Sequence, residues 1–455
     1  MSFSSISFLF FFLPFVLTAY ACLPWRNAVL LIVSLFFYAW GEGVYVVVLV
    51  AVIAMNYVVG ERISSRSSKL WLWIGVSANL VVLVYFKYLS FLLNDVLLVS
   101  HPIETKLPLG ISFFIFQSIS YLVDVKRNHA EKAENLVDLG LYISLFPQLI
   151  AGPIVRYNSI ANAIKARSIN AADARIGMEL FLLGLAQKVL IADTLAKPVD
   201  EIFALTPDTL STPIAWLGIS YYSLQIFYDF AGYSLMAIGL GRIFGFTFPQ
   251  NFNFPYASGS VTEFWRRWHM SLSSWFKDYL YIPLGGNRKG SSRTTFNLFC
   301  VFILCGLWHG AAWTFLIWGL LHGALLTLER LSLSRYLTRC PSLLSNLYMW
   351  MAISISWVIF RADNMTHASQ YLMTMFSDTD SPLPVAYYLS NELTVVFIVG
   401  LLFCYQTLPN RLRALQQHTN PVIVTIKYAL FALLITLTFA KVLAGSYSPF
   451  IYFRF

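Results

Sequence analysis

Charged residues are scarce in this chain: Asp, Glu, Lys and Arg make up 12% of its 455 residues, while apolar residues make up 58%. Soluble domains carry about a quarter charged and about half apolar residues. A soluble globular protein could not cover its surface with so little charge, so the composition predicts a polytopic membrane protein. The net charge of +9 comes from short basic segments between apolar runs. That distribution argues against a basic nucleic-acid-binding domain and is typical of the orientation signals of membrane proteins.

Cysteine is rare as well, and the five cysteines show neither metal-ligand spacing nor a disulfide pattern. We interpret them as small buried apolar side chains. We see no internal repeat, heptad pattern or cleavable signal sequence, and the first apolar run, 6–23, is expected to span the membrane. One membrane-embedded unit is therefore expected, with N-terminal spans in 1–240, a cytoplasmic irregular segment and amphipathic helix in 241–293, and histidine-bearing helices and C-terminal spans in 294–455.

Long apolar runs dominate the sequence. About 20 apolar residues cross a hydrocarbon core of about 30 Å. The candidate spans are 4–23, 27–40, 44–60, 70–93, 107–125, 176–196, 213–240, 344–361, 394–409 and 422–444. Together with the stretch 295–328 they predict an all-α fold of roughly 11–12 transmembrane helices, with re-entrant and amphipathic interfacial helices around a central tunnel.

The loops between these runs differ in charge. The basic loops are 61–69, 126–132, 156–175, 288–293, 330–339 and 411–413, whereas 198–212 and 362–393 contain no Lys or Arg. The positive-inside rule then places both termini outside. Residues 139–155 lie between basic segments and are interrupted by Pro147, Gly152 and Pro153. We interpret them as a re-entrant segment, which a membrane tolerates only where it is buried in protein or lines a cavity.

Histidine is rare, yet two of the seven histidines, His309 and His322, lie inside the apolar stretch 295–328. An ionisable group at membrane depth costs a few kcal/mol and is a functional candidate by default. As one helix the stretch would be roughly 51 Å long, which is too long for one span and short for two, so we expect a hairpin or a broken helix. In a continuous helix the two histidines would be rotated by about 220° from each other. They share a cavity only if the helix breaks, near Gly310, or if one of them is structural.

A third histidine, His269, lies in the segment 241–293, whose first half is irregular. Ser260 and Glu263 have the spacing of a capping box. Aromatic and aliphatic residues then recur at helical spacing up to Pro283, which predicts an amphipathic helix at the cytoplasmic interface. His269 lies on its apolar side. The helix is then either an anchor with a structural histidine or an element that brings His269 to a buried site.

The residue pattern leaves few kinds of catalytic site. No acidic residue lies within 295–328 and no HExxH motif occurs, which argues against a metal site. A GxSxG motif is absent, and no Ser-His-Asp triad is visible. What remains is a lone histidine that acts as general base on a hydroxyl group.

Seven segments together resemble the membrane-bound O-acyltransferase family, in the branch with alginate O-acetyltransferase and the D-alanyl transfer protein of teichoic acid synthesis. They are LPLGISFFIFQSISYLVDV (107–125), LFPQLIAGPIVRY (145–157), FYDFAGYSLMAIGLGRIFGF (227–246), NFNFPY (251–256), FWRRWHMSLSSWFKDYLYIPLGGNR (264–288), GLWHGAAWTFLIWGLLHG (306–323) and PFIYFRF (449–455). The series WRRWHMSLS, WHG and a second HG is the most specific part of the resemblance.

The resemblance implies a transferase of the bacterial inner membrane. It would move an acyl group, acetyl by resemblance to this branch, from a cytoplasmic thioester such as acetyl-CoA to a hydroxyl acceptor, for O-acetylation of an alginate- or cellulose-like exopolysaccharide. His322 matches the invariant catalytic histidine and would be the general base. His269 matches a second polar position, and His309 is either a third catalytic group or a packed structural histidine. Acetyl-CoA would be a co-substrate, without a bound cofactor or metal.

Further residues are expected to contact substrate: Trp265, Arg266, Arg267, Trp268, Asp229, Trp313 and Trp318. Arg266, Arg267, Lys277, Arg288 and Lys289 could meet the phosphates of a nucleotide donor, or they could reflect positive-inside bias alone. The oxyanion donor would be His269 or a tryptophan indole. Asp229 could orient a site group or be a paired structural charge, and Lys87 and Lys188 are expected to be paired or to reach the interface.

An exported partner of the SGNH-like type is expected to accept the acetyl group outside and pass it to the polysaccharide. Two rival classes stay open. A transporter would show internal repeats and pore-lining charges. A scaffold subunit of a polysaccharide export complex would tolerate the loss of all three histidines.

Overall fold

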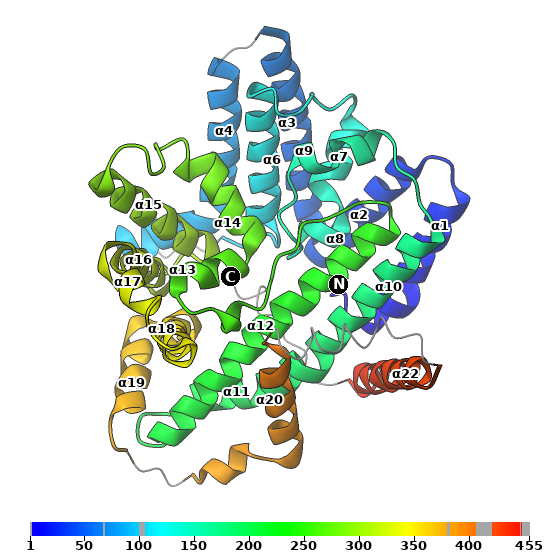
Figure 1. Ribbon diagram of the computed structural model, residues 1–455. Coiled ribbons are helices and arrows are strands. Elements are labelled where there is room, and N and C mark those ends of the chain that lie inside the picture. The colour runs from blue at the N-terminus through cyan, green and yellow to red at the C-terminus, as the bar shows by residue number, and fades with distance from the viewer. Residues whose placement is uncertain are drawn as a thin grey trace. The chain divides into compact units, whose positions relative to one another are not determined.

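The computed structural model describes residues 2–66, 69–99, 105–379, 383–405, 421–445 and 447, and throughout these residues the regular structure is helical (Figure 1). Five helical runs among them are long and apolar enough to cross a membrane: Arg26–Ser64, Lys69–Val96, Trp313–Leu337, Ser342–Arg361 and Pro421–Leu443. Phe8–Cys22 and Asn391–Phe403 are shorter apolar helices. The all-α polytopic fold is confirmed, whereas the larger number of spans and the central tunnel stay predictions. The basic loop 411–413 and the segment 449–455 lie outside the described residues.

The chain divides into two compact units, Met1–Leu183 with Tyr233–Gln250, and Gly184–Gly232 with Asn251–Phe455. The helices that begin in the first stretch are α1 Leu13–Cys22, α2 Arg26–Glu42, α3 Val46–Arg66, α4 Lys69–Leu83, α5 Leu89–Phe91, α6 Ile111–Lys126, α7 Leu136–Ser144, α8 Phe146–Leu149, α9 Tyr157–Lys165 and α10 Ala171–Ala186. Helices α3, α4 and α6 pack side by side in the first unit (Figure 1). Glycines allow the close packing, because a Cβ on Gly75 would lie 2.6 Å from Leu122 of α6.

The predicted re-entrant segment, 139–155, contains most of α7, the whole of α8 and the loop that follows. All of its residues from Leu139 to Val155 are buried. Its polar backbone groups find partners inside the protein. The Tyr142 hydroxyl donates to the Val155 carbonyl at 3.0 Å, and the Phe146 amide donates to the Ser34 hydroxyl at 3.1 Å. Buried irregular backbone needs such partners. Whether the segment enters a membrane stays a prediction.

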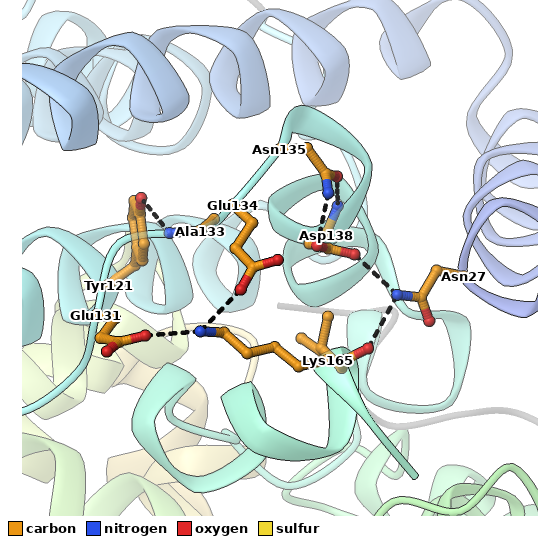
Figure 2. Close-up of polar contacts among 9 residues, drawn as sticks. Asn27, Tyr121, Glu131, Ala133, Glu134, Asn135, Asp138 and Lys165 are labelled. Carbon is orange, nitrogen blue, oxygen red and sulfur yellow. Dashed lines mark hydrogen bonds and ion pairs between the residues drawn. The ribbon is translucent and has the colours of Figure 1, made fainter.

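Polar contacts tie the loop before α7 to its neighbours (Figure 2). Lys165 forms ion pairs with Glu131 at 2.6 Å and Glu134 at 2.9 Å. Asn135 caps α7 by accepting the Asp138 amide proton at 2.9 Å, and Asp138 accepts a hydrogen bond from Asn27 of α2 at 2.8 Å. These bonds join α2, α7 and α9 at one surface of the first unit.

The remaining helices are α11 Asp193–Phe203, α12 Thr212–Ile243, α13 Val261–Arg267, α14 Met270–Phe276, α15 Ser291–His309, α16 Trp313–Leu328, α17 Ser334–Leu337, α18 Ser342–Arg361, α19 Met365–Phe376, α20 Asn391–Phe403 and α22 Pro421–Leu443. The stretch 295–328 is the expected hairpin: α15 ends at His309, and α16 begins at Trp313 and packs along it (Figure 1). The break at Gly310 is confirmed. Two glycines set the spacing, since a Cβ on Gly306 would lie 2.2 Å from the Phe315 carbonyl oxygen and one on Gly319 would lie 2.3 Å from the Phe302 carbonyl oxygen.

The sequence predicts a single amphipathic helix after Ser260, and this prediction is wrong in one respect. The helix is divided at His269 into α13 and α14. This residue has φ 43° and ψ 52°, in the left-handed region. The neighbouring segment takes the place of the missing helical hydrogen bonds. The Asn253 amide donates to the Arg267 carbonyl and the Met270 amide to the Asn251 carbonyl, both at 2.9 Å. This pairing is tertiary, and helical periodicity does not contain it.

A Gly319→Ala substitution tests the close packing of α15 and α16. Alanine is favoured over glycine inside a helix by about 1 kcal/mol, but its Cβ would meet a backbone atom that cannot rotate away. We expect a net loss of about 1–3 kcal/mol, typical of overpacking, measured as a lower midpoint of thermal unfolding in detergent. Leu328→Ala, at a 50% exposed position of the same helix, is the control and should leave the midpoint nearly unchanged. An unchanged midpoint for Gly319→Ala would contradict the packing.

Candidate active site

The three histidines singled out by the sequence are all buried in the second unit. His322 lies in the middle of α16, His309 is the last residue of α15, and His269 joins α13 to α14. Their side chains come from three places in the sequence, and the fold gathers them in one cluster of aromatic rings.

His322 is held from one side by a tryptophan of α13. The Trp265 indole Nε1–H donates to His322 Nδ1 at 3.1 Å, with the ring centroids 5.2 Å apart. The Trp318 ring lies 4.7 Å away and the Phe302 ring 6.0 Å away. The other ring nitrogen, Nε2, is buried and has no hydrogen-bond partner among the described residues. This nitrogen is the part of His322 that is left for chemistry.

His309 and His322 both contact the Trp318 indole, because the chain turns between the two histidines to form the hairpin. Its ring lies 5.2 Å from Trp318, 5.2 Å from Phe360 and 5.0 Å from Trp308. A continuous helix would have separated the two imidazoles by rotation. The break at Gly310 therefore places both beside Trp318.

His269 is joined to this cluster through Trp308, at 5.8 Å, and also packs on the edge of Phe230 at 4.6 Å. Its Nδ1 lies 3.1 Å from Asn251 Oδ1, and its Nε2 is buried without a hydrogen-bond partner among the described residues. His269 lies outside the five helical runs that could span a membrane. Burial lowers its pKa to about 3. The imidazole is therefore neutral near pH 7.

A buried carboxylate fixes the helix that carries Trp265. Glu329, just after α16, accepts hydrogen bonds from the Val261 amide at 2.7 Å, the Thr262 amide at 2.8 Å and the Thr262 hydroxyl at 2.5 Å. Ser260 accepts the Glu263 amide proton at 3.0 Å, so the predicted N-cap is confirmed. The Glu329 carboxylate thereby joins the start of α13 to the end of α16, and this holds Trp265 against His322.

Sequence reasoning missed Glu329. A usable signal was present, because Glu329 follows His322 by seven residues, which is close to two full turns of one helix. An acidic residue on the same helix face as a buried histidine, at the end of an apolar stretch, is a reason to expect a structural or catalytic partner.

A cavity of about 880 Å³ lies next to the histidine cluster. Its lining includes Trp265 and Phe302, the rings that contact His322, together with Cys305. Charged side chains also line it: Arg266, Lys277, Arg330, Glu263 and Glu329. Its size is within the range of small-molecule sites, and its combination of apolar and convergent polar groups is also typical of them.

The other residues predicted to contact substrate have different environments. Trp268 is buried among Phe264, Trp357 and Tyr256. Arg267 forms an ion pair with Glu263 at 2.7 Å. Trp313 begins α16 and is 47% exposed. The cavity lining includes Arg266 and Lys277 but not Arg267, Arg288 or Lys289.

Asp229 takes part in a buried ion cluster. Lys188 contacts Asp193 at 2.5 Å and Asp229 at 2.8 Å, and all three side chains are 2% exposed. Asp229 and Lys188 are therefore paired charges, which was one of the alternatives that the sequence left open for each of them. In the first unit, the buried Lys87 donates to the Ser112 hydroxyl at 3.1 Å.

Comparison with known proteins agrees with the motifs. Residues 35–378 match the model of the membrane-bound O-acyltransferase family. The probable alginate O-acetylase AlgI of Pseudomonas putida is 39% identical, and the match covers the whole of both chains. The peptidoglycan O-acetyltransferase of Helicobacter pylori is 38% identical over 82% of this chain and 79% of that protein. The teichoic acid D-alanyltransferase of Bacillus subtilis is 32% identical over 48% of this chain and 58% of its own length.

The burial of His269 predicts a dependence of stability on pH. An unfolded histidine titrates near pH 6.5, whereas in the folded protein the pKa is about 3. Because the folded pKa is lower, the unfolded state binds the proton first. The stability is fully present above pH 6.5 and falls as the pH drops toward 3, by up to about 1.4 kcal/mol for each pH unit.

We expect the unfolding midpoint of the wild-type protein to fall between pH 7 and pH 4.5 more steeply than that of His269→Gln, measured by a thermal shift in detergent. His129→Gln removes a histidine whose side chain is 58% exposed and should keep the wild-type slope. Parallel curves for all three proteins would show that His269 does not carry this dependence.

Proposed function

This chain belongs to the membrane-bound O-acyltransferase family and is an O-acyltransferase, and from that premise we propose a donor, an acceptor and a site. The donor is a cytoplasmic acetyl thioester, acetyl-CoA in the simplest case. The acceptor is a hydroxyl group outside the inner membrane, and the end product is an O-acetylated exopolysaccharide of the alginate or cellulose type. The protein would cross the bacterial inner membrane several times with both termini in the periplasm.

One observation supports the site above all others. His322 is buried and held at Nδ1 by the Trp265 indole, and its ring packs on Trp265 and Phe302, two rings that line the 880 Å³ cavity. A reacting group needs a fixed position and exclusion of water, because electrostatic interactions are stronger in a dry environment. His322 is accordingly the group on which we expect transfer to depend.

The cavity supports the donor side of the proposal. Arg266, Lys277 and Arg330 line it and are exposed, as recognition of anionic phosphates requires. They lie in or beside segments that the positive-inside rule assigns to the cytoplasm. A thioester that binds here would direct its acyl end toward Trp265 and Phe302 and hence toward His322.

The acceptor side rests on the names of the relatives, which refer to alginate, peptidoglycan and teichoic acid. We propose that an exported SGNH-like acetyltransferase takes the acetyl group from this protein and delivers it to the polymer. A transporter or a scaffold of an export complex is the alternative. Neither would need a histidine for acyl transfer, so one assay separates the transferase from both alternatives.

In that assay, purified protein in detergent is mixed with acetyl-CoA labelled in the acetyl group and a small hydroxyl acceptor. Wild type should acetylate the acceptor, and His322→Ala should lose about 10²- to 10⁴-fold in rate, the usual contribution of an acid–base group. His129→Ala, at an exposed position, is the control and should keep full activity. Equal activity of wild type and His322→Ala would remove His322 from the chemistry.

The role of the cavity cations is tested separately with Arg266→Gln, Lys277→Gln and Arg330→Gln. Each should raise KM for acetyl-CoA by roughly tenfold with little change in kcat, since one charge-assisted hydrogen bond is worth about 1.5–3 kcal/mol. Arg335→Gln is the control, because Arg335 is exposed on α17 but does not line the cavity.

An acetyl thioester without phosphates makes the test specific. With such a donor, the three variants and wild type should have the same KM. A rise in KM that is as large for the phosphate-free donor would mean that the cations act on the structure of the site and not on the donor.

A further inference from the structure

The hydrogen bonds around His269 assign its tautomer. Asn251 Oδ1 accepts the Ser271 backbone amide at 3.2 Å and the Ser271 hydroxyl at 2.9 Å. A backbone amide can only donate, so the Asn251 atom is the oxygen. His269 Nδ1, at 3.1 Å from it, must then be the donor. A neutral imidazole carries one proton, so His269 has its lone pair on Nε2.

The hydrogen bond to His322 assigns the opposite tautomer. An indole N–H is a donor only. His322 Nδ1, which lies 3.1 Å from Trp265 Nε1, must therefore be the acceptor. The single proton of the neutral ring then sits on Nε2, and that nitrogen can donate a hydrogen bond but has no lone pair with which to take a proton.

The two imidazoles thus present different chemistry through the same atom. Nε2 of His269 is an acceptor and Nε2 of His322 is a donor, and both atoms are buried without a hydrogen-bond partner among the described residues. Acyl transfer to a hydroxyl needs both kinds of group, a base for the hydroxyl proton and a donor for the oxygen that becomes negative.

We propose that His269 is the general base and that His322 donates a hydrogen bond to the acyl carbonyl oxygen, with Asn251 and Trp265 as the positioning residues that fix the two tautomers. This division rests on the proposed function. It exchanges the roles that the sequence predicts, in which His322 removes the proton and His269 is a candidate oxyanion donor.

The chemical step balances without any further reactant. The acceptor hydroxyl oxygen attacks the thioester carbonyl carbon while its proton passes to His269 Nε2. The carbonyl electron pair moves onto oxygen, which His322 Nε2–H holds. When the carbonyl re-forms, the carbon–sulfur bond breaks, and the leaving thiolate takes the proton from the His269 imidazolium. The products are the acetyl ester and the free thiol of the donor.

A continuous series of ring contacts through Trp308, His309 and Trp318 connects the two imidazoles. His269 packs on Trp308, Trp308 packs on His309, and Trp318 packs on both His309 and His322. A dry aromatic environment strengthens a hydrogen bond to a developing negative charge. It also disfavours an imidazolium, so His269 is neutral in the resting state.

The tautomers can be measured without any activity. Protein labelled with ¹⁵N in histidine is reconstituted in lipid nanodiscs, and ¹⁵N NMR shows which ring nitrogen carries the proton. His322→Gln and His269→Gln assign the two signals. We expect a protonated Nε2 in His322 and a protonated Nδ1 in His269. The same protonated nitrogen in both rings would overturn the proposal.

Trp265→Phe probes the cause of the His322 tautomer. It keeps an aromatic ring and removes the N–H donor, so the His322 proton should distribute over both nitrogens, and kcat should fall by about 10- to 100-fold with little change in KM. Trp357→Phe removes another buried indole N–H, one that donates to the Tyr256 hydroxyl at 3.3 Å, and should leave the His322 tautomer unchanged. An unchanged tautomer in Trp265→Phe would mean that this indole does not set it.

Paired substitutions test the division of roles. A glutamine amide can donate a hydrogen bond but cannot take the proton, so His322→Gln should be about 10- to 100-fold more active than His322→Ala. His269→Gln should be as inactive as His269→Ala. The opposite pattern would restore His322 as the base. A wild-type protein without acetyl transfer would instead overturn the proposed function, while the NMR result would still decide the tautomers.

Discussion

The Trp265 to His322 hydrogen bond is the contact on which the geometry of the candidate site depends. It fixes the ring of a histidine that would otherwise be an isolated polar group in an apolar helix, where an unsatisfied nitrogen costs about 1–3 kcal/mol. Two structural features hold it. Glycine packing between α15 and α16 places His322, and the Glu329 carboxylate places α13, which carries Trp265. Because Nδ1 accepts the indole hydrogen bond, Nε2 is the nitrogen of His322 that is left to contact a substrate.

Much of this organisation was predictable from the sequence. Apolar run lengths gave the all-α polytopic fold, the length of 295–328 together with Gly310 gave the hairpin, and the Ser260 spacing gave the start of α13. These features are local, since they depend on composition and on residues a few positions apart. The break at His269 was not predictable in this way, because it depends on the pairing of residues 251–253 with 267–270 through tertiary hydrogen bonds.

The roles of the buried ionisable residues also could not be predicted from the sequence alone. In a sequence, Asp229 within an apolar run and His322 within another look alike, as ionisable groups at membrane depth. In the structure Asp229 has a cationic partner, Lys188, which it shares with Asp193, whereas His322 has one neutral donor and a second nitrogen without a described partner. The difference between a structural ion and a candidate reacting group is therefore the partner, and the partner comes from a distant part of the chain.

The composition of the cluster also bears on the acceptor. A polysaccharide presents many hydroxyl groups, and each one that is buried needs a hydrogen-bond partner. The surroundings of His322 and His269 consist mainly of aromatic rings: Trp265, Phe302, Trp308, Trp318 and Phe230. Such a lining suits a thioester carbonyl and a single hydroxyl better than a sugar chain. This agrees with the proposed first acceptor, which would insert one nucleophilic group, and with the proposed partner protein, which would deliver the acetyl group to the polymer in a separate step.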